Sequence, residues 1–156
     1  MRFTIVAMGE RMPGWVDEGF GDYVRRMPRT LRVELKEVRP EPRREGRSVE
    51  QILEAEAERI EAAIPKGNLR VALDEHGRAL TSLELAGQID TWRSDSQDIA
   101  FIVGGPDGLA PRLKAAAAST MRLSSYTLPH GLVRVILAEQ LYRAISILAN
   151  HPYHRE

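Results

Sequence analysis

The sequence IAFIVGGPDG at residues 99–108 joins an uninterrupted apolar run to a turn that is rich in glycine. Five consecutive apolar residues, among them Ile and Val, predict a buried strand over residues 99–103. In open α/β sheets, ligands bind at the carboxyl ends of the strands, which is where this turn lies. The turn carries no nucleotide-binding fingerprint, and a turn of this composition is by itself more often only a turn. Both interpretations stay open on residue types alone.

Strands and helices alternate on both sides of this segment. Alternation of this kind predicts an α/β fold with a mostly parallel sheet flanked by helices, and the length predicts a single domain over residues 1–156. Two helices should begin at capping boxes, formed by Ser48 with Gln51 and by Thr81 with Glu84. The predicted strands are 2–8, 31–38, 69–74 and 99–103, and the predicted helices are 13–27, 48–64, 81–92, 109–118 and 132–149, with a brief segment of unassigned structure near 121–123.

The composition is that of an ordinary globular protein, with 43% hydrophobic and 28% charged residues, which excludes the disordered and collagen-like classes. There is no cysteine, and therefore no disulfide and no thiolate metal site. No apolar run approaches the ~20 residues of a membrane span, and the N-terminus lacks the features of a signal peptide. We therefore expect a cytoplasmic protein with no membrane partner.

The charges balance to zero, but Arg supplies nearly all of the 22 cationic side chains. Arginine binds phosphate in a bidentate manner and stacks on bases, which lysine does poorly. Two interpretations remain open, an ordinary solvated surface and a local phosphate-binding face. The clustered residues are Arg25, Arg26, Arg29 and Arg32 in one run and Arg39, Arg43, Arg44 and Arg47 in another.

The last predicted helix is apolar on two sides. Such a helix is buried on two sides, either in the middle of one subunit or at the interface of a homodimer, and the pattern favours neither. One side carries Val133, Leu137 and Leu141, and the other carries Val135, Ala138 and Tyr142.

Two further segments carry candidate chemistry. LSSYTLPH at 123–130 mixes apolar side chains with hydroxyls, which suits the lining of a small-molecule pocket as well as a buried strand and turn. NHPYHRE at 150–156 ends the printed sequence with aromatic and cationic groups that suit base stacking and phosphate contact. No metal is expected, because His151 and His154 have no further ligands beside them. His76 and Asp107 are interpreted as surface turn residues.

Taken together, four segments in order resemble one family, the ribosomal RNA large subunit methyltransferase H family of the SPOUT class. They are IVGGPDGL at 102–109, LSSYTLPH at 123–130, LVR with EQLYRA at 132–144, and NHPYHRE at 150–156. Met8-Gly9, Trp15 and Tyr23 are similar as well. The resemblance covers essentially the whole chain. It departs at Glu10, where a basic residue is expected.

This resemblance implies a SPOUT α/β-knot with a C-terminal trefoil knot, in a homodimer. It implies an enzyme that transfers a methyl group from S-adenosyl-L-methionine to N3 of a pseudouridine in helix 69 of 23S rRNA, within the assembled ribosome. By position, the cofactor would be bound by Leu73, Gly105, Leu123, Ser124, Ser125, Tyr126, Thr127 and Leu128.

For the chemistry, the resemblance points to the end of the chain. His154 is our hypothesis for the base that removes the N3 proton, with Tyr153 holding it. Arg155 and Arg134 would favour the resulting anion, and His130 would serve the loop structurally. Two alternatives remain, a SPOUT methyltransferase that modifies transfer RNA and a non-catalytic ribosome-associated protein that binds S-adenosyl-L-methionine.

Overall fold

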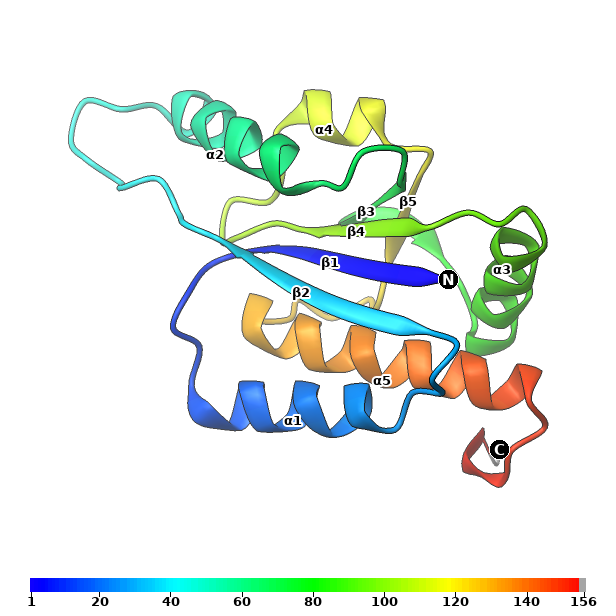
Figure 1. Ribbon diagram of the computed structural model, residues 1–156. Coiled ribbons are helices and arrows are strands. Elements are labelled where there is room, and N and C mark those ends of the chain that lie inside the picture. Colours follow the sequence, from blue (N-terminus) through cyan, green and yellow to red (C-terminus); the bar gives the residue numbers. More distant parts are fainter. Residues whose placement is uncertain (155–156) are drawn as a thin grey trace.

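The computed structural model describes residues 1–154 and contains a five-stranded, all-parallel sheet in the order β2-β1-β4-β3-β5 (Figure 1). The predicted α/β class with a mostly parallel sheet is confirmed. The strands are β1 (Arg2–Met8), β2 (Arg32–Val38), β3 (Leu69–Ala79), β4 (Ile99–Val103) and β5 (Ser119–Arg122). The helices are α1 (Gly14–Arg25), α2 (Val49–Ala63), α3 (Ser82–Ser94), α4 (Pro111–Ala116) and α5 (His130–Leu148), followed by a 3₁₀ turn, η1 (Pro152–His154).

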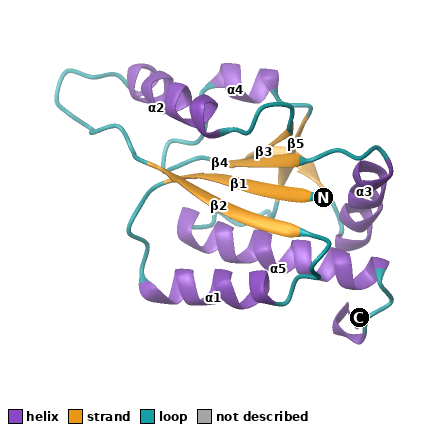
Figure 2. Cartoon of the chain, viewed as in Figure 1, coloured by secondary structure: helices purple, strands orange, loops and turns teal. Residues whose placement is uncertain are grey.

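Helices cover both faces of the sheet, as Figure 2 shows. Helices α2 and α4 pack over one face, and α1, α3 and α5 pack over the other. Strand β1 lies inside the sheet between β2 and β4, and its side chains alternate between the two cores. Phe3 and Ile5 face α3 and α5, whereas Val6 and Met8 face α2 and α4. A strand that is buried on both faces is expected to be mostly apolar, which explains the apolar run of β4 and the apolar residues of β1, where Thr4 is the buried polar exception.

Helices α2 and α3 begin at the predicted capping boxes. Both capping boxes are present, with Ser48 accepting from the backbone of Gln51 and Thr81 accepting from the backbone of Glu84. Each box satisfies two of the backbone N–H groups that a helix start leaves without partners. The start of each of these two helices is therefore determined by a segment of only four residues.

Strand β3 differs from the prediction. It continues to Ala79, with a shift of its register against β5 between Leu73 and Arg78. His76 therefore lies in the irregular part of a strand and not in a simple turn. Gly77 permits this geometry, because a Cβ there would lie 2.7 Å from backbone atoms of Met121 in β5. Such a close crossing of two backbones leaves no signal in hydrophobic periodicity.

Helix α5 is the central helix of its own layer. It packs against α1 on one side and α3 on the other, and Leu137, Ala138 and Leu141 are fully buried. Packing within one subunit thus explains why α5 is apolar on two sides. The apolar pattern of α5 therefore gives no support to the predicted homodimer. None of the helices within residues 1–154 is long and apolar enough to cross a membrane. The trefoil knot stays a prediction.

Candidate functional site

A cavity of about 820 Å³ lies at the carboxyl ends of β3 and β4. Its walls come from the end of β3, from the glycine loop (residues 104–108), and from the segment that joins β5 to α5. A volume of this size is typical of small-molecule sites, and the position is the usual one for ligands in parallel sheets. The glycine loop is therefore the wall of a cavity as well as a turn.

The glycine loop is closed on itself. The backbone N–H of Gly108 donates to the carbonyl oxygen of Gly105 at 3.0 Å, and Gly108 has a φ of 79°. At Gly104 a Cβ would lie 2.6 Å from the carbonyl oxygen of Gly108, so only glycine fits. At Gly105 a Cβ would press on Met8, 3.1 Å away. At its three glycines the loop therefore presents backbone without side chains to the cavity, which suits close contact with a ligand.

The predicted cofactor residues gather here, with one exception. Leu73, Gly105, Leu123, Ser124, Tyr126, Thr127 and Leu128 line the cavity, whereas Ser125 does not. The three leucines are partly buried and supply apolar surface, while the glycine loop supplies backbone polar groups. Tyr126 is 86% exposed. This combination fits a ligand with a flat aromatic part and a polar part, as S-adenosyl-L-methionine has.

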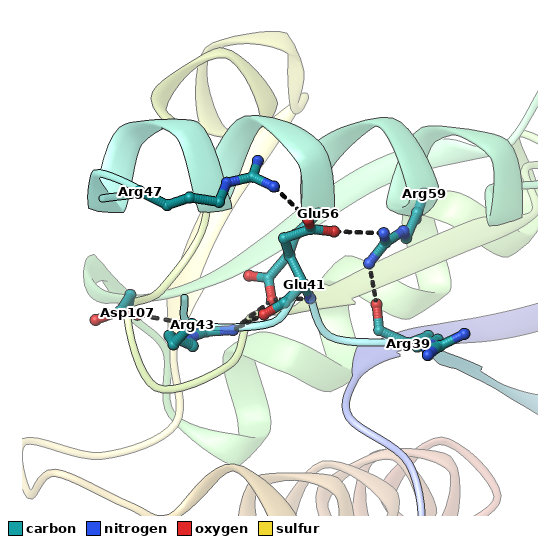
Figure 3. A network of polar contacts seen from close by, with 7 residues as sticks. All are labelled: Arg39, Glu41, Arg43, Arg47, Glu56, Arg59 and Asp107. Carbon is teal, nitrogen blue, oxygen red and sulfur yellow. Dashed lines mark hydrogen bonds and ion pairs between the residues drawn. The ribbon is translucent and has the colours of Figure 1, made fainter. Parts of the chain in front are cut away.

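His130 lines the same cavity at the first residue of α5, and an ion pair joins Lys114 to Asp74 across its wall at 3.7 Å. Asp107 is an exposed turn residue, as the sequence suggests, but its carboxylate is paired. Its Oδ2 accepts from the guanidinium of Arg43 at 3.0 Å (Figure 3). Within residues 1–154 there is no cluster of three or more His, Asp or Glu side chains that could hold a metal ion.

The chain end lies apart from this cavity in the same subunit. Tyr153 and His154 are in η1 and do not line the cavity. The Tyr153 hydroxyl donates to Oε1 of Glu139 at 3.0 Å. Glu139 lies about 13 Å further along the α5 axis than His130, at about 1.5 Å per residue. Arg155 lies outside the described residues.

An aromatic cluster holds the chain end against α5. The rings of Tyr153 and Tyr142 pack edge to face, with their centroids 4.6 Å apart. The guanidinium of Arg143 lies 5.1 Å from the centroid of the Tyr153 ring. Burial, together with hydrogen bonds to Tyr23 and Glu139, raises the pKa of the Tyr153 phenol, so this group stays protonated and donates. The Nδ1 atom of His154 is buried and has no partner within residues 1–154.

Arg134 is fully buried and faces neither solvent nor the cavity. Its guanidinium donates to Glu37 at 2.6 Å and to the carbonyl oxygen of Gly9 at 2.8 Å. Gly9, with a φ of 113°, follows the end of β1 and lies beside His130. In this structure Arg134 therefore joins the ends of β1 and β2 to the first turns of α5. This geometry supports a positioning role and no direct contact with a substrate anion.

Two sets of site residues escaped the sequence reasoning. One is Glu139 with Arg143, whose spacing of four residues is the usual signal for a helical ion pair and joins the chain end to α5. The other is Arg43 with Glu56 and Asp107, because Arg43 pairs with Glu56 of α2 and with Asp107 of the glycine loop. Partners that are distant in sequence leave no local signal, so only the fold reveals the second set.

The family model described as "Predicted SPOUT methyltransferase" matches residues 1–154. The chain belongs to the SPOUT methyltransferase family. Among its relatives are proteins of Burkholderia lata and Burkholderia ambifaria named "Ribosomal RNA large subunit methyltransferase H". Each is 56% identical over 155 residues, which cover 99% of this chain and 99% of the relative. The resemblance found in the sequence is thus confirmed.

Solved structures share the SPOUT fold at low sequence identity. A probable methylase family protein from Haemophilus influenzae superposes with a TM-score of 0.57 at 14% identity, covering 99% of this chain and 70% of the other. A probable rRNA-methyltransferase from Porphyromonas gingivalis gives a TM-score of 0.54 at 14% identity, covering 94% and 69%. At this identity the likeness concerns the fold alone.

Proposed function

We propose that this SPOUT methyltransferase methylates ribosomal RNA of the large subunit, with S-adenosyl-L-methionine as the methyl donor. The observation that carries the proposal is the 56% identity, over nearly the whole chain, to proteins named "Ribosomal RNA large subunit methyltransferase H". The finer proposal is that the acceptor is N3 of a pseudouridine in helix 69 of 23S rRNA, in the assembled ribosome. Such a substrate would require the protein to work in the cytoplasm.

The cavity at the glycine loop is the proposed cofactor site. Leu73, Leu123 and Leu128 would flank the adenine, and the backbone of Gly105 and of residues 123–128, with the hydroxyls of Ser124 and Thr127, would bind its polar edges. Ser125 does not line the cavity in this structure, so its predicted contact with the cofactor has no support from the geometry. When bound, S-adenosyl-L-methionine supplies a methyl group on a positively charged sulfur. The role of the residues around it is alignment with the acceptor nitrogen, which can supply much of the rate.

The acceptor N3 carries a proton that has to leave. We propose that His154 accepts it, since an imidazole ring can act as a general base and the buried Nδ1 atom of His154 has no partner within residues 1–154. Tyr153 would hold the chain end in place through its hydrogen bond to Glu139. Arg155 would stabilise the anion that forms on the pseudouridine ring when N3 loses its proton. Arg134, being fully buried, would instead position Gly9 and the start of α5.

A homodimer would bring these two halves together. The cavity and the chain end of one subunit are separated along α5, because Tyr153 is tied to Glu139 while His130 marks the cavity. We propose that the chain end of one subunit completes the cavity of its partner. The site would then be composite, and a monomer would bind the cofactor but transfer no methyl group.

Recognition of the RNA would rest on shape and on local arginines, because the net charge is zero. Part of the second arginine run is engaged internally, since Arg43 and Arg47 pair with Glu56 and Glu41. Exposed side chains outside such pairs include those of Arg29, Arg32 and Arg44. We expect a modest salt dependence of binding, well below that of a strongly basic protein.

A methyl-transfer assay tests the proposal. Labelled S-adenosyl-L-methionine is offered with ribosomes that lack the modification, with free 23S rRNA, and with bulk transfer RNA. Label in the ribosomes alone supports the proposal. Label in transfer RNA supports the alternative SPOUT substrate, and cofactor binding without any transfer supports the non-catalytic alternative; either result would overturn the proposal.

A further inference from the structure

The loop between β2 and α2, residues 39–47, is tied down by charged side chains, although its Pro, Arg and Glu content predicts a mobile loop. We call residues 39–47 the strap. Glu41 accepts from Arg47 at 2.6 Å and also from Arg59 of α2. Arg59 in turn donates to the carbonyl oxygen of Arg39 at 3.0 Å. Figure 3 shows how these contacts hold the strap against α2.

Arg43 stands at the centre of this network. Its Nη1 donates to Glu56 of α2 and to the carbonyl oxygen of Glu41, each at 2.9 Å. Glu56 is 2% exposed, and a carboxylate so deeply buried requires a partner. The hydrogen bond that Arg43 donates to Glu56 raises the pKa of Arg43, so the guanidinium stays charged. One edge of Arg43 is therefore fixed by a buried anchor.

The other edge of Arg43 reaches the glycine loop. Its Nη2 donates to Asp107 at 3.0 Å, with 37% of the Arg43 side chain and 36% of the Asp107 side chain exposed. A solvent-exposed ion pair between two free side chains contributes little, partly because both must be ordered. Here that cost is reduced, because Glu56 already orders the planar guanidinium. Asp107 therefore meets a preorganised cation.

Asp107 belongs to the loop whose backbone forms one wall of the cavity. The loop is otherwise closed by its own backbone contact between Gly108 and Gly105. We propose that Arg43 is a positioning residue that sets the conformation of the glycine loop through Asp107, so that the strap controls the affinity of the cavity for S-adenosyl-L-methionine. This inference rests on the proposed function, because it requires that this cofactor bind in the cavity.

The test is calorimetric titration of the purified protein with S-adenosyl-L-methionine. Asp107→Ala removes the link to the glycine loop but leaves the pair of Arg43 with Glu56 intact, so it should not disturb the fold. We expect its Kd to rise about threefold, as the loss of one partly exposed ion pair implies. Arg44→Ala is the matched control, since Arg44 neighbours Arg43 and its side chain makes no polar contact within residues 1–154. Its Kd should stay at the wild-type value.

A double-mutant cycle separates positioning from general weakening. Arg43→Ala combined with Asp107→Ala should raise Kd no further than Arg43→Ala alone, while KM for the cofactor rises and kcat on ribosomes stays within about twofold. Unchanged Kd in Asp107→Ala, or strictly additive effects in the cycle, would overturn the inference. Wild-type protein that binds no S-adenosyl-L-methionine would overturn the proposed function itself. If Arg43→Ala fails to fold, Arg43→Lys replaces it in the cycle, because lysine keeps the charge but lacks the planar fork that contacts Glu56 and Asp107 together.

Discussion

Replacement of Glu37 by Ala should destabilise the fold, because it leaves the buried guanidinium of Arg134 without its carboxylate. Arg134 is fully buried and would keep only the carbonyl oxygens of Gly9 and Met8, at 2.8 and 3.4 Å. Removing one partner of a fully buried ion pair costs about 3–5 kcal/mol. Glu37 itself is 36% exposed, so solvent screens part of this pair and we reduce the expected cost to about 2 kcal/mol.

The measurement is urea unfolding of wild type and variant at equal protein concentration, because association of subunits would shift the apparent stability. A loss of about 2 kcal/mol corresponds to a decrease of roughly 4–8 °C in Tm for a chain of this size. Glu34→Ala is the matched control, because Glu34 lies on the same strand and its one ion pair within residues 1–154 is an exposed contact with Arg2, at 3.8 Å. That variant should change the free energy of unfolding by less than about 0.5 kcal/mol. Equal effects of the two substitutions would refute the assigned role of Arg134.

Three further predictions concern the site. His154→Ala should lower kcat on ribosomes by about 10²–10⁴-fold, which is the usual contribution of a general base. Calorimetry should show unchanged binding of S-adenosyl-L-methionine to this variant. Full activity of the variant would exclude His154 as the general base. Gly104→Ala should abolish cofactor binding, because its Cβ would lie 2.6 Å from the carbonyl oxygen of Gly108, and wild-type affinity would contradict the loop geometry. Stability should decrease above about pH 10.0, because the pKa of Tyr153 is raised from that value in the folded state and the unfolded chain therefore loses its proton first. In pH-dependent unfolding, Tyr153→Phe should show less of this decrease, and an identical decrease would mean that other groups cause it.

The parts of the fold that are fixed by nearby residues could be predicted from the sequence. The apolar run at 99–103 forms β4, and the capping boxes at Ser48 and Thr81 begin α2 and α3. Each of these signals involves residues within a few positions of one another, so no tertiary knowledge is needed. The irregular end of β3 was missed because it depends on the approach of Gly77 to Met121, more than forty residues away.

The site could be predicted only in part, for the same physical reason. The segment 123–128 and the glycine loop were recognised by their residues, and most of them line one cavity. The environment of Arg134 was not foreseeable, since a cation among apolar helix residues gives no indication that Glu37 will lie beside it. The second arginine run was open to two interpretations, and Arg43 fits neither, because its partners come from α2 and the glycine loop. Charges that find partners across the fold cannot be assigned from spacing along the chain.

The most direct test of the proposed rRNA methylation is to map the methyl group that the wild-type protein transfers to ribosomes lacking the modification. Nuclease fragments of the labelled 23S rRNA would be analysed by mass spectrometry, with the Gly104→Ala protein as the negative control. We predict one methyl group per large subunit, on N3 of a helix 69 pseudouridine, and none with Gly104→Ala. Methylation at another nucleotide, or equal labelling by the variant with the altered glycine loop, would contradict it.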